Sequence, residues 1–439
     1  MRIGTEHFRK MSLICLTVLL AGVFMFGISC KKEDEVYPVI ILENPASQIT
    51  IGPTDTVLVE ARITDNNTIE KVTVQLLTIN FAPVSSALIL EPNSSEYRLS
   101  VNYILQNPQL SSGTYLIAVT ASDGKNTAYA YREVYVLALP QLRKAVFVLS
   151  KNNTGIVNIS RADTLHQLQS FLNLPSDYLG SSVDSKNQVL YVLGQTTGGL
   201  TFIDANSAAL INSIPPNTPM GPPTFQFLHF KDNLNFISFY DGNVRAYDQN
   251  GTRNFEAIQS GYARPNAILK TEDYVYVENF YLNAQQNKLE QYFYPSGISN
   301  QIIFLDMDIV SLYEKSSDEL FLFGDKNGQA VLEKYDRLNN SIQLIRTFGN
   351  YTIHDVFQYR NTQYYLATSN GLFRYDYDMN SLSPLTSIAS QGIKYDPLMN
   401  EFFLSENSAV HVIDGASFTE KYTLSCPDSV LNVLFLYDR

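Results

Sequence analysis

The chain has 439 residues, 45% of them hydrophobic, and a formal net charge of −12. This length predicts two domains, and the hydrophobic content excludes a disordered tail. The acidic balance argues against nucleic-acid binding, which needs clustered Lys and Arg side chains.

The first residues have the pattern of a secretory leader. A short basic segment precedes the apolar run Met11–Ile28, and small residues then lead into Cys30. The segment Gly27-Ile28-Ser29-Cys30 resembles a lipobox, which implies a signal peptide over residues 1–29 and a diacylglyceryl thioether on Cys30. The apolar run also has the length of a spanning helix, so an uncleaved anchor is the alternative.

The acidic run after Cys30 resembles the export signal of Bacteroidetes-type surface lipoproteins. That resemblance implies an outer-membrane lipoprotein exposed at the cell surface, with residues 30–37 as a lipidated tether. A merely solvated tether is the alternative. Because Cys15 lies in the leader and Cys30 at the lipid site, Cys426 is the one thiol left, and we expect no intrachain disulfide.

Residues 38–137 read as short strands separated by turns. Val57, Val59, Ala61 and Ile63 alternate with polar residues, as in a half-buried strand. We expect an immunoglobulin-like β-sandwich that serves as a spacer, followed by a linker over residues 138–143. The sequence 65–67 (Asp-Asn-Asn) is predicted to break the strand as a turn, in preference to ligating calcium.

Residues 144–439 contain a repeated apolar strand at intervals of about 43 residues, which is typical of a four-stranded propeller blade. The seven repeated strands lie at 146–149, 190–193, 235–239, 275–277, 320–323, 364–366 and 402–404. Most units also contain an apolar residue followed by aspartate, beginning with Ile203-Asp204. We interpret these aspartates as turn residues rather than as metal ligands or catalytic groups, and assign Ile159-Ser160 and Tyr294-Pro295 as the divergent pairs.

The two ends of this repeat predict how it closes. The first unit starts on its repeated strand, whereas the chain ends with an unmatched apolar strand, Val430–Leu436. A closed ring needs every blade completed, so this last strand is predicted to pair with Ala145–Ser150 as the inner strand of the first blade. Later inner strands would include Phe225–Phe230, Ile309–Tyr313 and His354–Tyr359.

The loose repeat of strand, turn and apolar-Asp pair is similar to quinoprotein-like or surface-layer-type propellers. The fold class expected is therefore all-β: an N-terminal immunoglobulin-like sandwich followed by a seven-bladed β-propeller closed by the C-terminal strand. The resemblance implies architecture and no active-site residues.

Catalytic patterns are few. His229 and His354 fall on predicted inner strands and are the candidates for catalysis in the propeller channel, with hydrogen-bonded structural histidines as the alternative. Cys426 is interpreted as a small buried hydrophobe. The sequence predicts no metal site and no cofactor.

Binding residues are expected on the loops that lead into the inner strands. Tyr178, Tyr262, Arg264 and Tyr351 lie there, and loop-borne Tyr and Arg suit recognition. The alternative is that these aromatic residues pack their own loops. The main hypothesis is a non-catalytic binding or scaffold protein whose partner is an envelope protein or glycan. The second is an extracytoplasmic lyase or hydrolase that uses the propeller channel.

Overall fold

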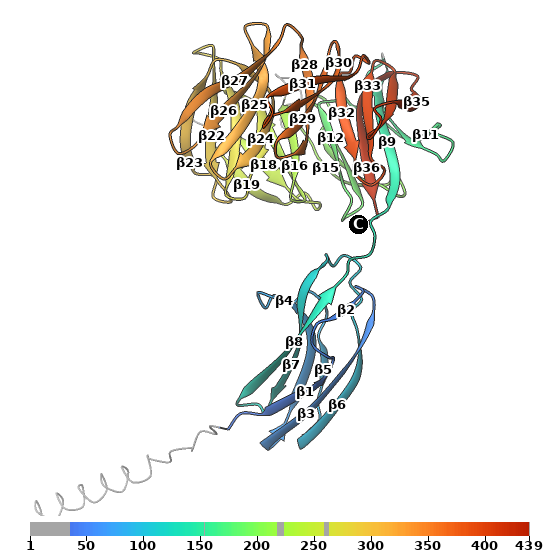
Figure 1. Cartoon of the computed structure of the whole chain (residues 1–439), viewed down its shortest axis with the longest axis vertical. Helices are drawn as coiled ribbons and strands as arrows, with labels where there is room; N and C mark the ends of the chain where they lie inside the picture. The colour runs from blue at the N-terminus through green and yellow to red at the C-terminus, as the bar shows by residue number, and fades with distance from the viewer. Residues whose placement is uncertain (1–35, 153, 217–223, 259–262, 439) are drawn as a thin grey trace, which may run out of the picture. The chain divides into compact units, whose positions relative to one another are not determined.

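The computed structural model describes residues 36–152, 154–216, 224–258 and 263–438. The leader, Cys30 and Tyr262 lie outside the described residues. Every regular element that is described is a β-strand, as Figure 1 shows, so the expected all-β class is confirmed. The chain separates into two compact units that meet at Pro140–Gln141.

The N-terminal unit consists of two sheets that share one apolar core. A three-stranded sheet has the order β1-β3-β6, and a five-stranded sheet has the order β2-β8-β7-β4-β5. The strands are β1 (Val39–Asn44), β2 (Ile49–Ile51), β3 (Thr56–Ile69), β4 (Lys71–Thr78), β5 (Leu88–Leu90), β6 (Ser94–Ile104), β7 (Gly113–Ser122) and β8 (Thr127–Val136). The inward side chains of both sheets form one cluster, which gives the two-layer packing of a sandwich.

The turn predicted over residues 65–67 is wrong. Strand β3 continues from Thr56 to Ile69, and its pairing with β6 shifts register between Thr64 and Ile69. Asp65 Oδ1 accepts a hydrogen bond from the Asn67 backbone N at 3.4 Å, which is a local contact inside the irregular strand. This Asx-rich segment therefore lies within the register shift of β3 against β6 and remains part of the extended strand.

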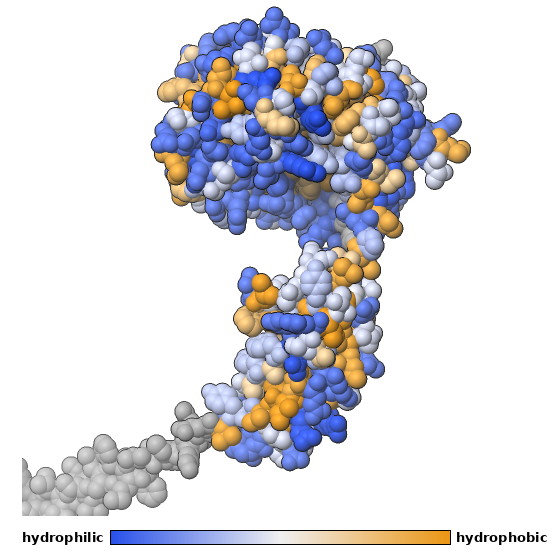
Figure 2. All heavy atoms as spheres, in the orientation of Figure 1, coloured by the Kyte–Doolittle hydropathy of each residue, from blue (hydrophilic) through white to orange (hydrophobic). Residues whose placement is uncertain are grey.

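Strand β8 has apolar side chains on both faces. Val134 and Val136 point into the core, whereas Tyr129, Tyr131 and Tyr135 are exposed by 61%, 41% and 43%. Figure 2 shows other apolar residues at the surface of this unit as well. Because apolar residues lie on both faces of β8, the polar–apolar alternation typical of a half-buried strand is weak along it.

In its described residues the C-terminal unit contains seven four-stranded antiparallel sheets, which we call blades 1 to 7. The innermost strands are β36 (Ser429–Tyr437), β12 (Gly180–Asp184), β16 (Phe225–Lys231), β20 (Ala263–Lys270), β24 (Asp308–Ser316), β28 (Ile353–Arg360) and β32 (Gly392–Asp396). The second strands are β9 (Arg143–Lys151), β13 (Val189–Leu193), β17 (Leu234–Phe239), β21 (Tyr274–Tyr281), β25 (Glu319–Lys326), β29 (Gln363–Thr368) and β33 (Glu401–Glu406).

The outer half of each blade completes the sheet. The third strands are β10 (Val157–Ala162), β14 (Leu200–Asp204), β18 (Val244–Tyr247), β22 (Gln286–Phe293), β26 (Gln329–Asp336), β30 (Gly371–Asp376) and β34 (Ala409–Asp414). The outermost are β11 (Leu168–Leu174), β15 (Leu210–Ile214), β19 (Arg253–Ala257), β23 (Ser299–Leu305), β27 (Ser341–Gly349), β31 (Ser381–Thr386) and β35 (Glu420–Ser425).

The ends of this unit meet in blade 1. Strand β36 pairs antiparallel with β9, and the register places Val430 opposite Ser150 and Leu436 opposite Ala145. Each innermost strand also contacts the next in a cyclic order that returns from β32 through β36 to β12. The predicted pairing of the last strand with the first repeated strand is confirmed.

Apolar packing between blades explains why the repeated strands are so hydrophobic. All seven predicted repeats coincide with the second strands of their sheets, where side chains on both faces are buried. The described residues of the C-terminal unit form seven apolar clusters, one at each interface between neighbouring blades. A strand that contacts a neighbouring sheet on both faces needs apolar residues without alternation.

The aspartates that follow the third strands are turn residues, as the sequence predicts, but the residue assigned in blade 1 is wrong. Asp204 Oδ1 accepts hydrogen bonds from the backbone N of Asn206 at 3.0 Å and of Ser207 at 2.7 Å, as an Asx turn requires. In blade 1 the equivalent residue is Asp163, whose Oδ1 accepts from two backbone N atoms of its own turn, both at 2.9 Å. The assignment of Ile159-Ser160 as the first pair is wrong, because β10 continues to Ala162 and the turn aspartate follows it.

Candidate functional site

Several innermost strands begin with a β-bulge. The register shifts between Ile353 and Asp355 in β28 and between Val430 and Asn432 in β36, and β16, β20 and β24 have similar shifts near their starts. A bulge inserts one residue and re-aims the side chains beside it. Asp355 and Asn432 follow their bulges directly, and both reach the neighbouring innermost strand.

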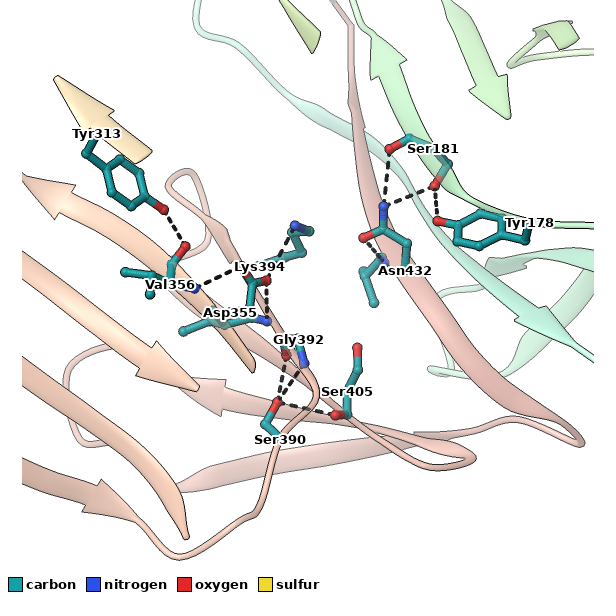
Figure 3. A network of polar contacts seen from close by, with 12 residues as sticks. Tyr178, Ser181, Tyr313, Asp355, Val356, Ser390, Gly392, Lys394, Ser405 and Asn432 are labelled. Atoms are coloured by element: carbon teal, nitrogen blue, oxygen red, sulfur yellow. Dashed lines mark hydrogen bonds and ion pairs between the residues drawn. The ribbon is translucent and has the colours of Figure 1, made fainter. Parts of the chain in front are cut away.

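Asn432 joins the last strand of the chain to blade 2. Its Nδ2 donates to the Ser181 backbone O at 3.2 Å and to Ser181 Oγ at 3.0 Å, while its Oδ1 accepts from the Val433 backbone N at 2.9 Å. Ser181 Oγ lies 2.9 Å from the Tyr178 hydroxyl (Figure 3). Burial raises the pKa of Tyr178 to about 12, so the hydroxyl keeps its proton at neutral pH.

Asp355 makes the equivalent connection from blade 6 to blade 7. Its Oδ1 accepts from the Val356 backbone N at 2.8 Å, and its Oδ2 accepts from the Ile393 backbone N at 3.1 Å. Lys394 Nζ lies 3.8 Å from the same Oδ2 (Figure 3). The Lys394 side chain is 43% exposed, so this ion pair orients the ammonium group while leaving it accessible.

Tyr313 extends the connection to blade 5. Its hydroxyl donates to the Val356 backbone O, and burial raises the pKa of this phenol above its ordinary value. On the other side, Ser390 Oγ donates to the Gly392 backbone O at 2.6 Å and to the Ser405 backbone O at 3.2 Å (Figure 3). Tyr313, Asp355 and Asn432 thus bridge neighbouring blades, whereas Ser390 joins two strands within blade 7.

We call Tyr178, Ser181, Asp355, Lys394 and Asn432 the inner-strand rim. Its hydrogen-bonding groups are mostly satisfied within the protein, and the cation of Lys394 remains partly open to solvent. Such an arrangement presents fixed polar groups on rigid strands, which suits recognition of a partner.

The structure does not bring the two candidate catalytic histidines together. His229 is the fifth residue of β16 and His354 is the second residue of β28, and these strands are not neighbours in the cyclic order. Burial lowers the pKa of His229 to about 4, so its ring is neutral, and Nε2 is buried without a hydrogen-bond partner among the described residues. His354 is exposed at its bulge.

The predicted binding residues have different environments. Arg264 is exposed at the start of β20, with its guanidinium 5.6 Å from the Tyr240 ring centroid. Tyr351 is half-buried and stacks on Phe373 with centroids 5.3 Å apart, and Tyr178 belongs to the inner-strand rim. Tyr262 lies outside the described residues. Of the three predicted binding residues that the structure describes, Arg264 is the one exposed to solvent.

Neither a cluster of metal-ligating side chains nor a membrane-spanning helix is found in the described part of the chain. In the described ranges, no group of three or more His, Cys, Asp or Glu side chains is arranged to hold a metal ion. No described helix has the length and apolar character needed to cross a membrane. Cys426 is a buried free cysteine whose pKa is raised to about 11 by burial, so its thiol stays protonated at neutral pH.

Sequence reasoning missed Asn432, Asp355 and Lys394. Asn432 carries a visible signal, because it is a polar residue inside the apolar run Val430–Leu436. Asp355 and Lys394 carry none, because their proximity depends on the bulge in β28 and on the packing of two blades.

The comparisons with known proteins identify the fold. No protein-family profile and no curated protein sequence matches the chain. A solved structure of a protein from Lactobacillus plantarum matches with a TM-score of 0.51 and 14% identity, covering 67% of this chain and 99% of that protein. A quinoprotein alcohol dehydrogenase-like protein from Bacteroides thetaiotaomicron matches with a TM-score of 0.47 and 12% identity, covering 91% and 99%.

BamB from Moraxella catarrhalis is a further match, with a TM-score of 0.39 and 10% identity over 66% of this chain and 92% of its own. Identities this low report the fold alone. The cyclic array of four-stranded sheets in the C-terminal unit is itself that of a β-propeller.

Proposed function

We propose that this chain is a cell-envelope lipoprotein of the Bacteroidetes type whose seven-bladed propeller is a non-catalytic binding or scaffold module. Lipid on Cys30 anchors it in the outer membrane, and an immunoglobulin-like sandwich carries the propeller at the cell surface. The partner is an envelope protein or a glycan, and the inner-strand rim together with Arg264 is the contact face.

The observation that carries this proposal is the inner-strand rim. Asp355 and Asn432 each tie two blades together, so the strands next to Lys394 are fixed before any partner arrives. Pre-organised groups lose little conformational freedom on binding, which raises affinity. Lys394, with its 43% exposed side chain, and the exposed Arg264 supply cations that an acidic protein surface or an anionic glycan would contact.

Two charge-matched double variants test the contact face. Lys394→Gln/Arg264→Gln removes the two cations of the proposed contact face. Arg253→Gln/Arg374→Gln removes one cation from the outermost strand of blade 3 and one from the third strand of blade 6. Full-length protein of each kind is applied to a glycan array and cross-linked to envelope proteins on intact cells. We expect the contact-face pair to lose binding by about tenfold or more, as for charge-assisted hydrogen bonds, and the control pair to retain it. Equal binding by both would contradict the contact face.

The anchor has its own test. Cys30→Ala is expected to abolish incorporation of labelled fatty acid and to release the protein from the membrane fraction, because one cysteine carries the lipid. Protease added to intact cells should degrade the wild-type protein if it is surface-exposed. Retention of label in Cys30→Ala would refute lipidation at this residue.

A further inference from the structure

A groove lies where blade 7 meets blade 1, away from the inner-strand rim. Its volume is about 490 Å³, within the range of cavities that bind small molecules. Its walls come from β9, β10 and the turn after β10 in blade 1, and from β33 and β35 in blade 7. Figure 1 shows β9, β33 and β35 together at this side of the unit. We call it the seam groove.

The charged lining of the seam groove is mainly basic. Arg143, Lys144 and Arg161 line it, and Asp163 is the one acidic lining residue. Asp163 directs both oxygens at its own turn, accepting from two backbone N atoms and from Gln169 Nε2 at 3.2 Å. The Asp163 carboxylate is therefore hydrogen-bonded within its own turn and forms no ion pair with the basic lining residues.

Lys144 and Arg161 form no ion pair within 4.0 Å among the described residues, and the carboxylate that interacts with Lys144 over a longer range is that of Asp204. Lys144 Nζ donates to Gln188 Oε1 at 2.9 Å, and Arg161 Nη2 donates to the Lys144 backbone O at 3.2 Å. Arg143 differs, because buried Asp396 and Glu401 hold it at 2.6 and 2.8 Å. The charge of Arg143 is thus balanced internally, whereas those of Lys144 and Arg161 are available to a ligand.

The remaining lining is apolar and aromatic. Val146, Phe403 and Leu424 are buried side chains that border the groove. His166, on the turn after β10 of blade 1, stacks on Tyr422 of β35 in blade 7, with centroids 3.7 Å apart and an interplanar angle of 18°. This stacked pair joins the two blades across the groove and adds a flat aromatic surface to its wall.

We propose that the seam groove binds a small amphipathic anion. A single carboxylate, sulfonate or phosphate group is held by Arg161 and Lys144, and an apolar body lies against Val146 and the His166–Tyr422 pair. The planar guanidinium of Arg161 matches such an anionic group, and burial of the apolar body adds hydrophobic stabilisation. This site is independent of the proposed contact face at the inner-strand rim.

The charge of the lining favours an anion over other ligands. A second groove, between blades 4 and 5, has Lys326 held by Asp306 at 2.6 Å and by Glu333 at 2.9 Å, so its single cation is already neutralised. A third cavity, in the N-terminal unit, has no charged lining residue. Of these three, the seam groove alone offers unpaired cations beside apolar surface, in a protein with a net charge of −12.

Three probes of similar shape and different charge test the proposal. The probes are 2-naphthoate, 2-naphthylmethanol and 2-naphthylmethylammonium, each titrated into full-length protein by calorimetry. We expect 2-naphthoate to bind most tightly. Arg161→Gln should weaken its binding by about tenfold or more, as expected for loss of a charge-assisted hydrogen bond, and leave binding of the alcohol unchanged.

Arg374→Gln is the matched control. Arg374 lies two residues before Asp376 on the third strand of blade 6, as Arg161 lies two residues before Asp163 on the third strand of blade 1. It should bind 2-naphthoate like the wild type. Lys144→Gln, on a more exposed side chain, provides a second groove variant in case Arg161→Gln lowers the thermal unfolding midpoint. Failure of 2-naphthoate to bind the wild type, equal binding of all three probes, or equal loss in the Arg374→Gln control would overturn the proposal.

Discussion

Replacing Leu436 with Ala should destabilise the C-terminal unit, because it removes buried packing between the last strand, β36, and blade 2. Leu436 is 1% exposed and packs in the cluster between blades 1 and 2. The change removes three carbon atoms, worth about 2.5 kcal/mol at roughly 0.8 kcal/mol each, and the cavity that remains raises the loss to about 3 kcal/mol. With a urea dependence of about 3 kcal/mol per molar, the midpoint should fall by about 1 M.

The assay must report the two units separately. Pulse-labelling hydrogen exchange followed by mass spectrometry at each urea concentration does so, because peptides from residues 57–76 belong to the N-terminal unit and peptides from residues 189–203 belong to the C-terminal unit. We expect the midpoint of the second set to fall and that of the first set to stay unchanged.

Leu431→Ala is the control on the same strand. Leu431 is half-buried at the bulge between Val430 and Asn432, so its truncation should cost about 1 kcal/mol or less. If Leu436→Ala cost no more than Leu431→Ala, or if it also lowered the midpoint of the N-terminal unit, the argument that β36 stabilises the C-terminal unit through buried packing would be wrong.

Three further changes act on buried charge. Arg143→Met leaves Asp396 and Glu401 buried with one cation fewer and should cost on the order of 3–5 kcal/mol in unfolding free energy, measured by urea denaturation. Burial raises the pKa of Glu278 from 4.5 to about 8, so wild-type stability should fall as pH rises through that window, and Glu278→Gln should remove this fall. Burial lowers the pKa of His229 from 6.5 to about 4, so stability should fall as pH drops across that window, and unfolding curves of His229→Gln should lack this component.

The strand framework of the C-terminal unit could be read from local sequence. Each second strand is a run of apolar residues buried on both faces, such as Leu190–Leu193, and that run needs no knowledge of its neighbours. The pairing of Val430–Leu436 with Ala145–Ser150 could also be predicted. The first blade lacks an inner strand and the chain ends with an unmatched apolar strand, so the second can complete the first.

What local sequence could not supply depends on tertiary pairing. The strand through Asp65–Asn67 has the composition of a turn, and it lies in a register shift between β3 and β6 that local sequence does not reveal. The residues of the seam groove are far apart in the chain, and Arg161 and Tyr422 become neighbours of one cavity only when blade 7 packs on blade 1. Amino-acid composition gives no indication that residues of these two blades line the same groove.

Closure and the candidate contact face are physically coupled through one residue. Asn432 lies on the closing strand, yet its amide fixes Ser181 and, through it, the Tyr178 hydroxyl in blade 2. A variant that loosens β36 would therefore disturb the inner-strand rim without removing any group that contacts a partner. Loss of binding in such a variant says little about recognition. Lys394 and Arg264 lie on other strands, so their neutral variants separate recognition from closure.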